Sequence, residues 1–199
     1  MEEFQKHFNS SYAYALYQRK DKKNPDYEWI NEWTPRYQEL TKQMTDEQKD
    51  EMHLHSPDDL LRRDKCLYLI HNQQMVGCIA GYLRKQVVEI ESVGIHPDYR
   101  NKKLCTKILS FFISLWPSIY RFELDNMGGI GACRCYINAF HSMGYDHSLH
   151  YQINYIYPEE YNFKPAEEKC TALGTGYTMV FTKRKGGRTR KRSTRKRYA

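Results

Sequence analysis

The chain has 199 residues, which is the size of one domain or of one domain with an appendage. Its composition of 40% hydrophobic, 28% charged and 14% aromatic residues excludes a wholly disordered chain, a collagen and a coiled coil. The longest nearly apolar stretch, residues 109–116, is shorter than the roughly 20 residues that a membrane span requires. The polar start MEEFQKHFNSS does not resemble a secretory signal. We therefore expect an intracellular protein, cytoplasmic or nuclear, without membrane contact.

The net charge of +7 comes from one end of the chain. Residues 183–199 contain ten of the 31 lysines and arginines and none of the 24 acidic residues, so the remainder is mildly acidic. This composition predicts a disordered basic tail over residues 184–199. The basic run 183–199 is expected to contact nucleic acid or another polyanion through charge, without reading a sequence.

Residues 1–64 are predicted to be the mainly helical N-terminal part of the domain. Alternating tyrosine and alanine over residues 10–17 favour a first strand. Apolar residues at helical spacing from Trp29 to Met44 predict a helix that begins or kinks at Pro35. Thr45 and Gln48 have the spacing of a capping box, which predicts the start of another helix.

Residues 65–183 are predicted to form the core. Three apolar segments, at 66–71, 75–83 and 87–95, are separated by polar turns and predict an antiparallel meander. A buried helix over 104–116, a strand over 119–124, a helix over 132–143 with Gly144 as its C-cap, and strands over 146–157 and 177–183 follow. Runs of strands interrupted by single helices indicate an α+β fold, with a mixed, mostly antiparallel sheet flanked by helices.

The segment VVEIESVGIHPDYRNKKLCT, residues 87–106, carries the chemistry. It predicts a strand, a basic loop and the start of a helix. The cations Arg100, Lys102 and Lys103 precede backbone amides that can bind an anion at a helix N-terminus. From the residues alone, either a phosphate or pyrophosphate site or a solvated basic loop is consistent with this pattern.

The stretch IHPDYRNKKLCTKIL, residues 95–109, resembles the acetyl-CoA-binding motif of the GNAT N-acetyltransferase superfamily. A later signature of that family, an aromatic residue four positions before Gly-Phe or Gly-Tyr, is matched by Phe140 with Gly144 and Tyr145. The resemblance covers residues 66–183. It implies a GNAT-like fold and transfer of an acetyl group from acetyl-CoA to a primary amine on a small molecule or a peptide; no motif identifies this acceptor.

The resemblance also implies which residues bind acetyl-CoA. The backbone of Val93, Gly94 and Ile95 would lie along the acetyl and pantetheine arm, with the Ile95 amide stabilising the oxyanion. A β-bulge near residues 92–94 would separate this strand from the next. Backbone amides of the loop and the following helix, helped by the two lysines, would hold the pyrophosphate: Arg100, Asn101, Lys102, Lys103, Leu104, Cys105 and Thr106.

Three departures from the family pattern bear on catalysis. Lys103 and Cys105 occupy positions where the family loop has glycine or another small residue. Phe140 stands where many members have a tyrosine that acts as general acid. Tyr136, one helical turn earlier, would protonate the leaving thiolate only if the cofactor sat about one turn deeper, and otherwise lines the core. An alternative is therefore a catalytically eroded GNAT-fold binding or scaffold module with a polyanion-binding tail.

Two carboxylates are candidate bases. Glu89 and Glu91 point to one face of their strand if it is regular, and the resemblance places a catalytic glutamate of the histone-type branch at Glu89. Adjacent carboxylates would raise the pKa of one of them, as a base for an ammonium requires. The alternative is a pair that faces solvent on an exposed sheet face.

The cysteines and histidines are predicted to have structural roles. Six cysteines without a CxxC pattern favour buried reduced thiols. Cys133, Cys135, His141 and His147 superficially resemble zinc ligands, but two cysteines two positions apart point to different sides of a helix, so no metal is expected. The pair at 53 and 55 in the run HLH is expected to be two surface histidines.

Overall fold

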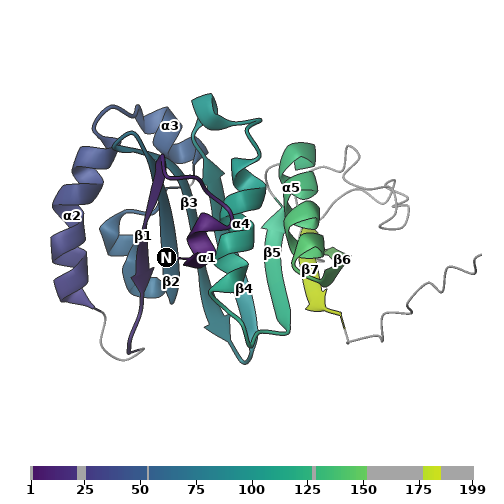
Figure 1. Ribbon diagram of the computed structural model, residues 1–199. Helices are drawn as coiled ribbons and strands as arrows, with labels where there is room; N and C mark the ends of the chain where they lie inside the picture. Colours follow the sequence, from purple (N-terminus) through teal and green to yellow (C-terminus); the bar gives the residue numbers. More distant parts are fainter. Residues whose placement is uncertain (1, 22–25, 53, 127–128, 152–176, 185–199) are drawn as a thin grey trace, which may run out of the picture.

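The computed structural model describes residues 2–21, 26–52, 54–126, 129–151 and 177–184 (Figure 1). Within these ranges, seven strands form one sheet in the order β1-β2-β3-β4-β5-β7-β6. β4 and β5 pair in parallel and the other neighbours pair antiparallel, which confirms the predicted mixed sheet. The strands are β1 (Tyr12–Gln18), β2 (Lys65–His71), β3 (Gln74–Arg84), β4 (Val87–Ile95), β5 (Arg121–Asn126), β6 (Tyr145–Tyr151) and β7 (Tyr177–Lys183).

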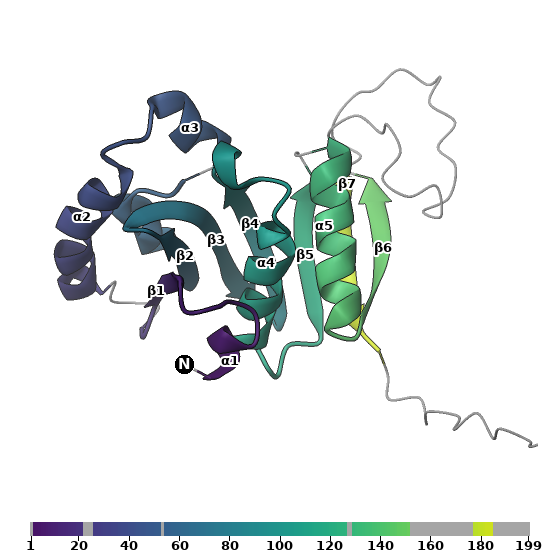
Figure 2. The same cartoon turned by 45° about the horizontal axis from the view of Figure 1, so that its top comes forward.

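Helices cover both faces of the sheet (Figure 2). α4 and α5 lie side by side on one face with α1, and α2, α3 and η1 lie against the other. The strand β2 is buried on both faces: Leu67 and Leu69 point into the α4–α5 core, while Tyr68 points into the α2 core. The helices are α1 (Glu2–Gln5), α2 (Tyr27–Thr41), α3 (Asp46–Glu51), η1 (Pro57–Arg62), η2 (Pro97–Tyr99), α4 (Leu104–Ser114) and α5 (Gly129–Ser142).

The capping box that starts α3 is confirmed. The Thr45 hydroxyl accepts the backbone N–H of Gln48 at 3.2 Å, and the Gln48 side chain accepts the N–H of Thr45 at 2.9 Å. Of the two alternatives at Pro35, a helix start is wrong, because α2 starts earlier, where the Asp26 carboxylate accepts the N–H of Trp29 at 3.1 Å, and continues through Pro35. The predicted strand at 10–17 corresponds to β1, which pairs with β2 and so joins the N-terminal part to the sheet.

The predicted elements after β5 agree with the structure with shifted boundaries. α5 begins at Gly129, three positions before the predicted start at 132, and Gly144 follows it with a φ of +84°, as expected of a C-cap. Residues 152–157 of the predicted strand lie outside the described residues, as do residues 185–199 of the basic tail. None of the helices in the described ranges is long and apolar enough to cross a membrane.

Candidate active site

The candidate site lies where the strands β4 and β5 stop pairing. The parallel register runs from Val87–Arg121 to Ile90–Leu124 and ends there, although β4 continues to Ile95. Beyond that point, the described residues of β5 pair only with β7. The C-terminal half of β4 is therefore an edge without a strand partner on the β5 side, within the part of the chain that the structure describes.

A β-bulge marks the same point. Ala80 pairs with Ser92 and the next residue, Gly81, pairs with Ile90, so Glu91 is the extra residue on β4. A bulge bends its strand and increases the local twist. The bulge predicted near residues 92–94 is thus present one position earlier, where β4 leaves β5.

The backbone of Val93 and Ile95 faces the unpaired edge. The N–H of His96 donates to the carbonyl of Val76 at 3.1 Å, which sets the phase of the antiparallel ladder between β3 and β4. Because bonded and non-bonded pairs alternate along such a ladder, the N–H and C=O groups of Val93 and Ile95 point away from β3. Gly94 bonds to β3 instead, so two of the three residues predicted along the pantetheine arm present their backbone to the edge.

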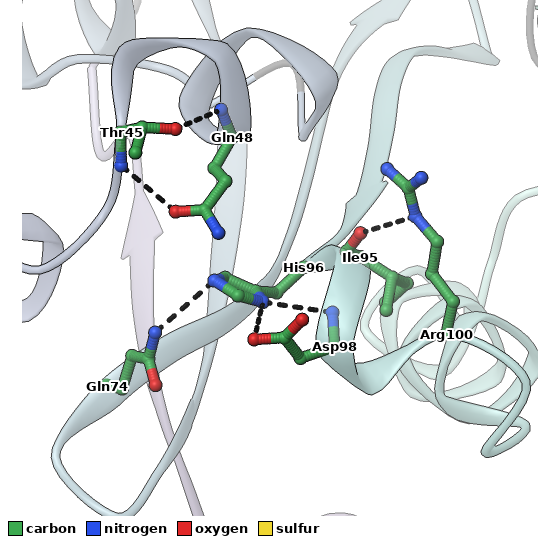
Figure 3. A network of polar contacts seen from close by, with 7 residues as sticks. All are labelled: Thr45, Gln48, Gln74, Ile95, His96, Asp98 and Arg100. Atoms are coloured by element: carbon green, nitrogen blue, oxygen red, sulfur yellow. Dashed lines mark hydrogen bonds and ion pairs between the residues drawn. The ribbon is translucent and has the colours of Figure 1, made fainter.

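The loop after β4 is fastened to the strand end by the contacts in Figure 3. His96 is 1% exposed; its Nδ1 accepts the N–H of Asp98 at 3.3 Å, and its Nε2 lies 3.3 Å from the side-chain amide of Gln74. The Nε of Arg100 donates to the carbonyl of Ile95 at 3.3 Å. The predicted anion loop is thereby held at the end of the open edge.

Two residues of the loop between β4 and α4 have a left-handed backbone conformation although neither is glycine. Lys103 has a φ of 59° and Asn101 a φ of 63°, both in the left-handed region that glycine adopts most readily. Lys103 therefore adopts a backbone conformation that suits glycine, at the position where the family resemblance expects a glycine. The cost of this conformation for a residue with a Cβ is about 1–2 kcal/mol.

The N-terminus of α4 is open to an anion. Lys103 is its N-cap and contributes no side-chain hydrogen bond to it. The first backbone N–H groups of a helix, here including those of Leu104, Cys105 and Thr106, have no acceptor within the helix. The positive end of the helix dipole and the adjacent Lys102, whose ammonium lies 4.6 Å from the ring centre of Tyr99, add attraction for a phosphate.

A disulfide joins the start of α4 to α5. Cys105 and Cys135 are bonded, with their Cα atoms 6.1 Å apart. The prediction of reduced thiols is wrong for these two residues, because the packing of α4 on α5 brings them within the range that a disulfide spans, which no spacing in the sequence indicates. It is also wrong for Cys133, which is disulfide-bonded as well. Cys66 and Cys78 are free and buried, as predicted. No group of three or more His, Cys, Asp or Glu side chains suited to a metal ion occurs among the described residues.

The predicted bases lie near the bulge, each with its own partners. The hydroxyl of Tyr82 donates to the Glu89 carboxylate at 2.5 Å, and Arg84 lies 3.8 Å from it. Glu91 forms an ion pair with Arg63. Burial and the bond to Glu89 raise the pKa of Tyr82 to about 12. The two carboxylates are thus each balanced by a guanidinium.

The candidate acid is part of the core. Tyr136 is 6% exposed within the cluster between α4, α5 and the sheet. Phe140, at the family's tyrosine position, is fully buried and stacks on Phe181 with ring centres 3.8 Å apart. Both side chains therefore have a packing role on this face of the sheet.

One polar contact at the bulge is not predicted by the sequence. The Nε2 of His55, between α3 and η1, lies 2.6 Å from the hydroxyl of Ser92. The Tyr68 hydroxyl donates to the His55 carbonyl at 3.2 Å. The prediction of a surface histidine is therefore wrong for His55, while residue 53 lies outside the described residues. No local signal announces this contact, because its partners are 37 positions apart.

The acetyltransferase (GNAT) family matches residues 24–145, which is more than half of the chain. The chain belongs to the GNAT family. Its fold is similar to that of diaminobutyrate acetyltransferase from Paenibacillus lautus, solved with L-2,4-diaminobutyric acid and coenzyme A, at 10% identity and a TM-score of 0.52, covering 85% of this chain and 95% of that one. Another similar structure is a GNAT acetyltransferase from Elizabethkingia anophelis with acetyl-CoA bound, at 11% identity and a TM-score of 0.48, covering 89% of this chain and 100% of that one. A third is the ribosomal-protein-S18-alanine N-acetyltransferase of Escherichia coli, at 12% identity and a TM-score of 0.46, covering 88% of this chain and 98% of that one. The comparison with curated proteins finds no match.

Proposed function

We propose that this GNAT chain transfers an acetyl group from acetyl-CoA to a primary amine. The observation that carries the proposal is the continuity between the unpaired edge of β4 and the uncapped start of α4. Acetyl-CoA has an arm that contains amides and, at the far end of the arm, a pyrophosphate. Its binding requires backbone hydrogen-bonding groups along the arm, followed by an anion site for the pyrophosphate. The unpaired edge of β4 and the start of α4 would supply them, and the loop that His96 and Arg100 fasten joins the two.

The chain's own groups have distinct tasks in this proposal. The amides at the start of α4, with Lys102 and Lys103, hold the pyrophosphate. The backbone of Val93 and Ile95 binds the arm, and the Ile95 amide stabilises negative charge on the carbonyl oxygen during attack. Acetyl-CoA, as co-substrate, supplies an activated thioester.

The chemistry then depends mainly on bringing the thioester and a neutral amine together, because holding two reactants in contact removes much of the entropic cost of reaction. A thiol has a pKa of about 8.5, so its thiolate is a good leaving group without a dedicated acid. The absence of a tyrosine hydroxyl at position 140 is therefore compatible with transfer.

The first test is binding to the full-length chain. Acetyl-CoA and CoA are titrated while the melting temperature and the heat of binding are measured, since a ligand of the native state raises its stability by mass action. Tripolyphosphate serves as the control for simple charge attraction, including attraction to the basic residues 183–199. Acetyl-CoA that binds much more tightly than tripolyphosphate supports the site.

Transfer is tested by CoA release with a panel of amines: L-2,4-diaminobutyric acid, spermidine, a peptide with a free α-amino group and a peptide with an internal lysine. Amine-dependent CoA release supports the proposal and names the acceptor class. Binding without release from any of these amines favours the eroded binding module. A chain that binds acetyl-CoA no better than tripolyphosphate overturns the proposed cofactor site.

A further inference from the structure

The segment between α3 and η1 is pressed onto β4 just past the bulge. A Cβ at Gly94 would lie 1.6 Å from the carbonyl oxygen of Met52, so the two backbones are in direct contact. His55 contacts Ser92, and Tyr68 holds the carbonyl of His55 from the neighbouring strand β2. These contacts place the His55 imidazole against Ser92, on the face of the sheet opposite α4 and α5.

Ser92 lies between His55 and the first residue of the unpaired edge in the chain, Val93. It is 8% exposed, its side chain meets His55, and its neighbour Val93 presents its backbone to the unpaired edge where the proposed site binds the thioester arm. Glu89 and Glu91, the carboxylates on the same stretch, are engaged by Tyr82, Arg84 and Arg63. Besides these two carboxylates, the imidazole of His55 is another basic side chain that lies near the bulge.

We propose that His55, acting through the hydroxyl of Ser92, is the base that accepts the proton of the acceptor amine, an inference that rests on the proposed function. An alkyl amine is mostly protonated at neutral pH, since its pKa is about 10, and it cannot attack until a proton leaves. Imidazole, with an ordinary pKa of about 6.5, is neutral at that pH and better matched to this task than a carboxylate of ordinary pKa near 4.

Proton transfer from the amine precedes its attack on the thioester. The ammonium N–H donates its proton to Ser92 Oγ while the Ser92 hydroxyl proton passes to His55 Nε2, leaving an imidazolium and a neutral amine. The nitrogen lone pair forms a bond to the thioester carbonyl carbon. The C–S bond then breaks, its electron pair leaves on sulfur, and the second proton on nitrogen goes to the thiolate. The imidazolium returns its proton to solvent.

The groups around His55 suit a transient positive charge. Asp59 of η1 interacts electrostatically with both His55 and Arg63. Tyr68 of β2 donates to the backbone carbonyl of His55, and Arg63 is paired with Glu91 of β4. Burial raises the pKa of Asp59, but hydrogen bonds from Ser56 outweigh it and a positive charge on His55 or Arg63 lowers it further, so the pKa of Asp59 is lowered. An ionised Asp59 would stabilise the imidazolium that forms at His55.

The test compares full-length His55→Gln, Ser92→Ala and Glu89→Gln with the wild type. The acceptor is the amine of the panel above that the wild type acetylates fastest, and kcat/KM is measured by CoA release from about pH 6 to about pH 10. Acetyl-CoA affinity and the melting temperature are measured for each variant. The matched control is His141→Gln, a partly buried histidine whose Nε2 lies 2.9 Å from His147 Nδ1 on the other side of the sheet.

We expect His55→Gln and Ser92→Ala to lower kcat/KM at neutral pH by about 100-fold, the usual size of general-base catalysis, with little change in acetyl-CoA affinity. The rate of His55→Gln should keep rising with pH as the amine loses its proton unaided, whereas the wild-type rate levels off above the pKa of His55. The control should keep the wild-type profile.

Two results would overturn the inference. One is a His55→Gln variant whose rate falls by the same factor at every pH, since this indicates a structural role. The other is a change of pH profile in Glu89→Gln and none in His55→Gln, which would return the base to the carboxylate. Failure of the proposed function itself is seen separately, as a wild type that does not bind acetyl-CoA or that releases no CoA with any amine of the panel; the second result also overturns a base at His55.

Discussion

The carbonyl oxygen of Met52 occupies the space that a side chain at Gly94 would need, only 1.6 Å from where a Cβ would stand. Close approach of two backbones is a recurring reason for glycine. The end of α3 is thereby seated on β4 beside the bulge. Gly94 thus allows the segment that carries His55 to pack against β4, while the backbone of Gly94 itself bonds to β3.

Replacing Gly94 by alanine should therefore destabilise the fold strongly. The atom in the way belongs to backbone and cannot rotate aside, so we expect a loss of about 3 kcal/mol or more in the free energy of unfolding, measured by urea denaturation. Gly131→Ala in α5 is the matched control, because nothing lies within 4 Å of its Cβ. It should raise stability by about 0.5–1 kcal/mol. Equal effects of the two substitutions would contradict this reading of Gly94.

Lys103→Gly should raise the melting temperature, or leave it unchanged, because glycine relieves the left-handed strain of about 1–2 kcal/mol at the cost of a more flexible unfolded chain. Lys102 is not among the residues with positive φ, so glycine relieves no strain there and Lys102→Gly should lower the melting temperature. In titrations, both variants lose one positive charge, and acetyl-CoA should bind each a few-fold more weakly at low salt. A lower melting temperature for Lys103→Gly than for Lys102→Gly would refute the interpretation of the loop.

Local signals allowed most of the sheet to be predicted. The strands β2, β3 and β4 are bounded by turn residues, and the capping box needs only Thr45 and Gln48. Pro35 could either begin or kink α2 from the sequence alone, whereas the cap at Asp26 starts that helix at Tyr27, eight residues before Pro35. A helix interior with enough packing, here Ile30 and Trp33 in the core, tolerates one proline.

Contacts between distant segments could not be predicted. His55 and Ser92 are 37 positions apart, and Cys105 and Cys135 are 30 apart. Each contact depends on how a helix or turn packs on the sheet, which one sequence does not specify. The strand–loop–helix around Arg100 was predictable because its residues are contiguous. The partners of Glu89 and Glu91 depend on the bulge and on η1.

The bond between Cys105 and Cys135 should be found in the purified protein and should stabilise it. A closed loop of this length lowers the entropy of the unfolded chain, which corresponds to about 3–4 kcal/mol. Proteolysis without reductant should yield peptides linked through Cys105 and Cys135, detected by mass spectrometry. The double variant Cys105→Ala, Cys135→Ala should unfold at lower urea than Cys78→Ala, which removes a free buried thiol. Separately alkylated Cys105 and Cys135 would show that the bond is absent.

Phe140→Tyr should not increase acetyl transfer. The ring is fully buried and stacked on Phe181, so an added hydroxyl would lose its bonds to water without a prepared partner. We expect a loss of about 1–3 kcal/mol in stability and an unchanged or lower kcat. A large gain in transfer would instead indicate an otherwise competent site that lacks only its acid.

The stability of the fold should fall as the pH drops below about 6.5, the ordinary pKa of histidine. Burial, and then the neighbouring His141, lower the pKa of His147 in the folded protein, and burial lowers that of His7. The unfolded chain therefore binds these protons more readily, so stability is complete above the unfolded pKa and declines as the pH falls toward the folded values. Urea denaturation across this range should show a shallower decline for His147→Gln, and NMR titration should place the His147 midpoint below about 6.5. An identical decline in the variant and the wild type would mean that His147 does not contribute to it.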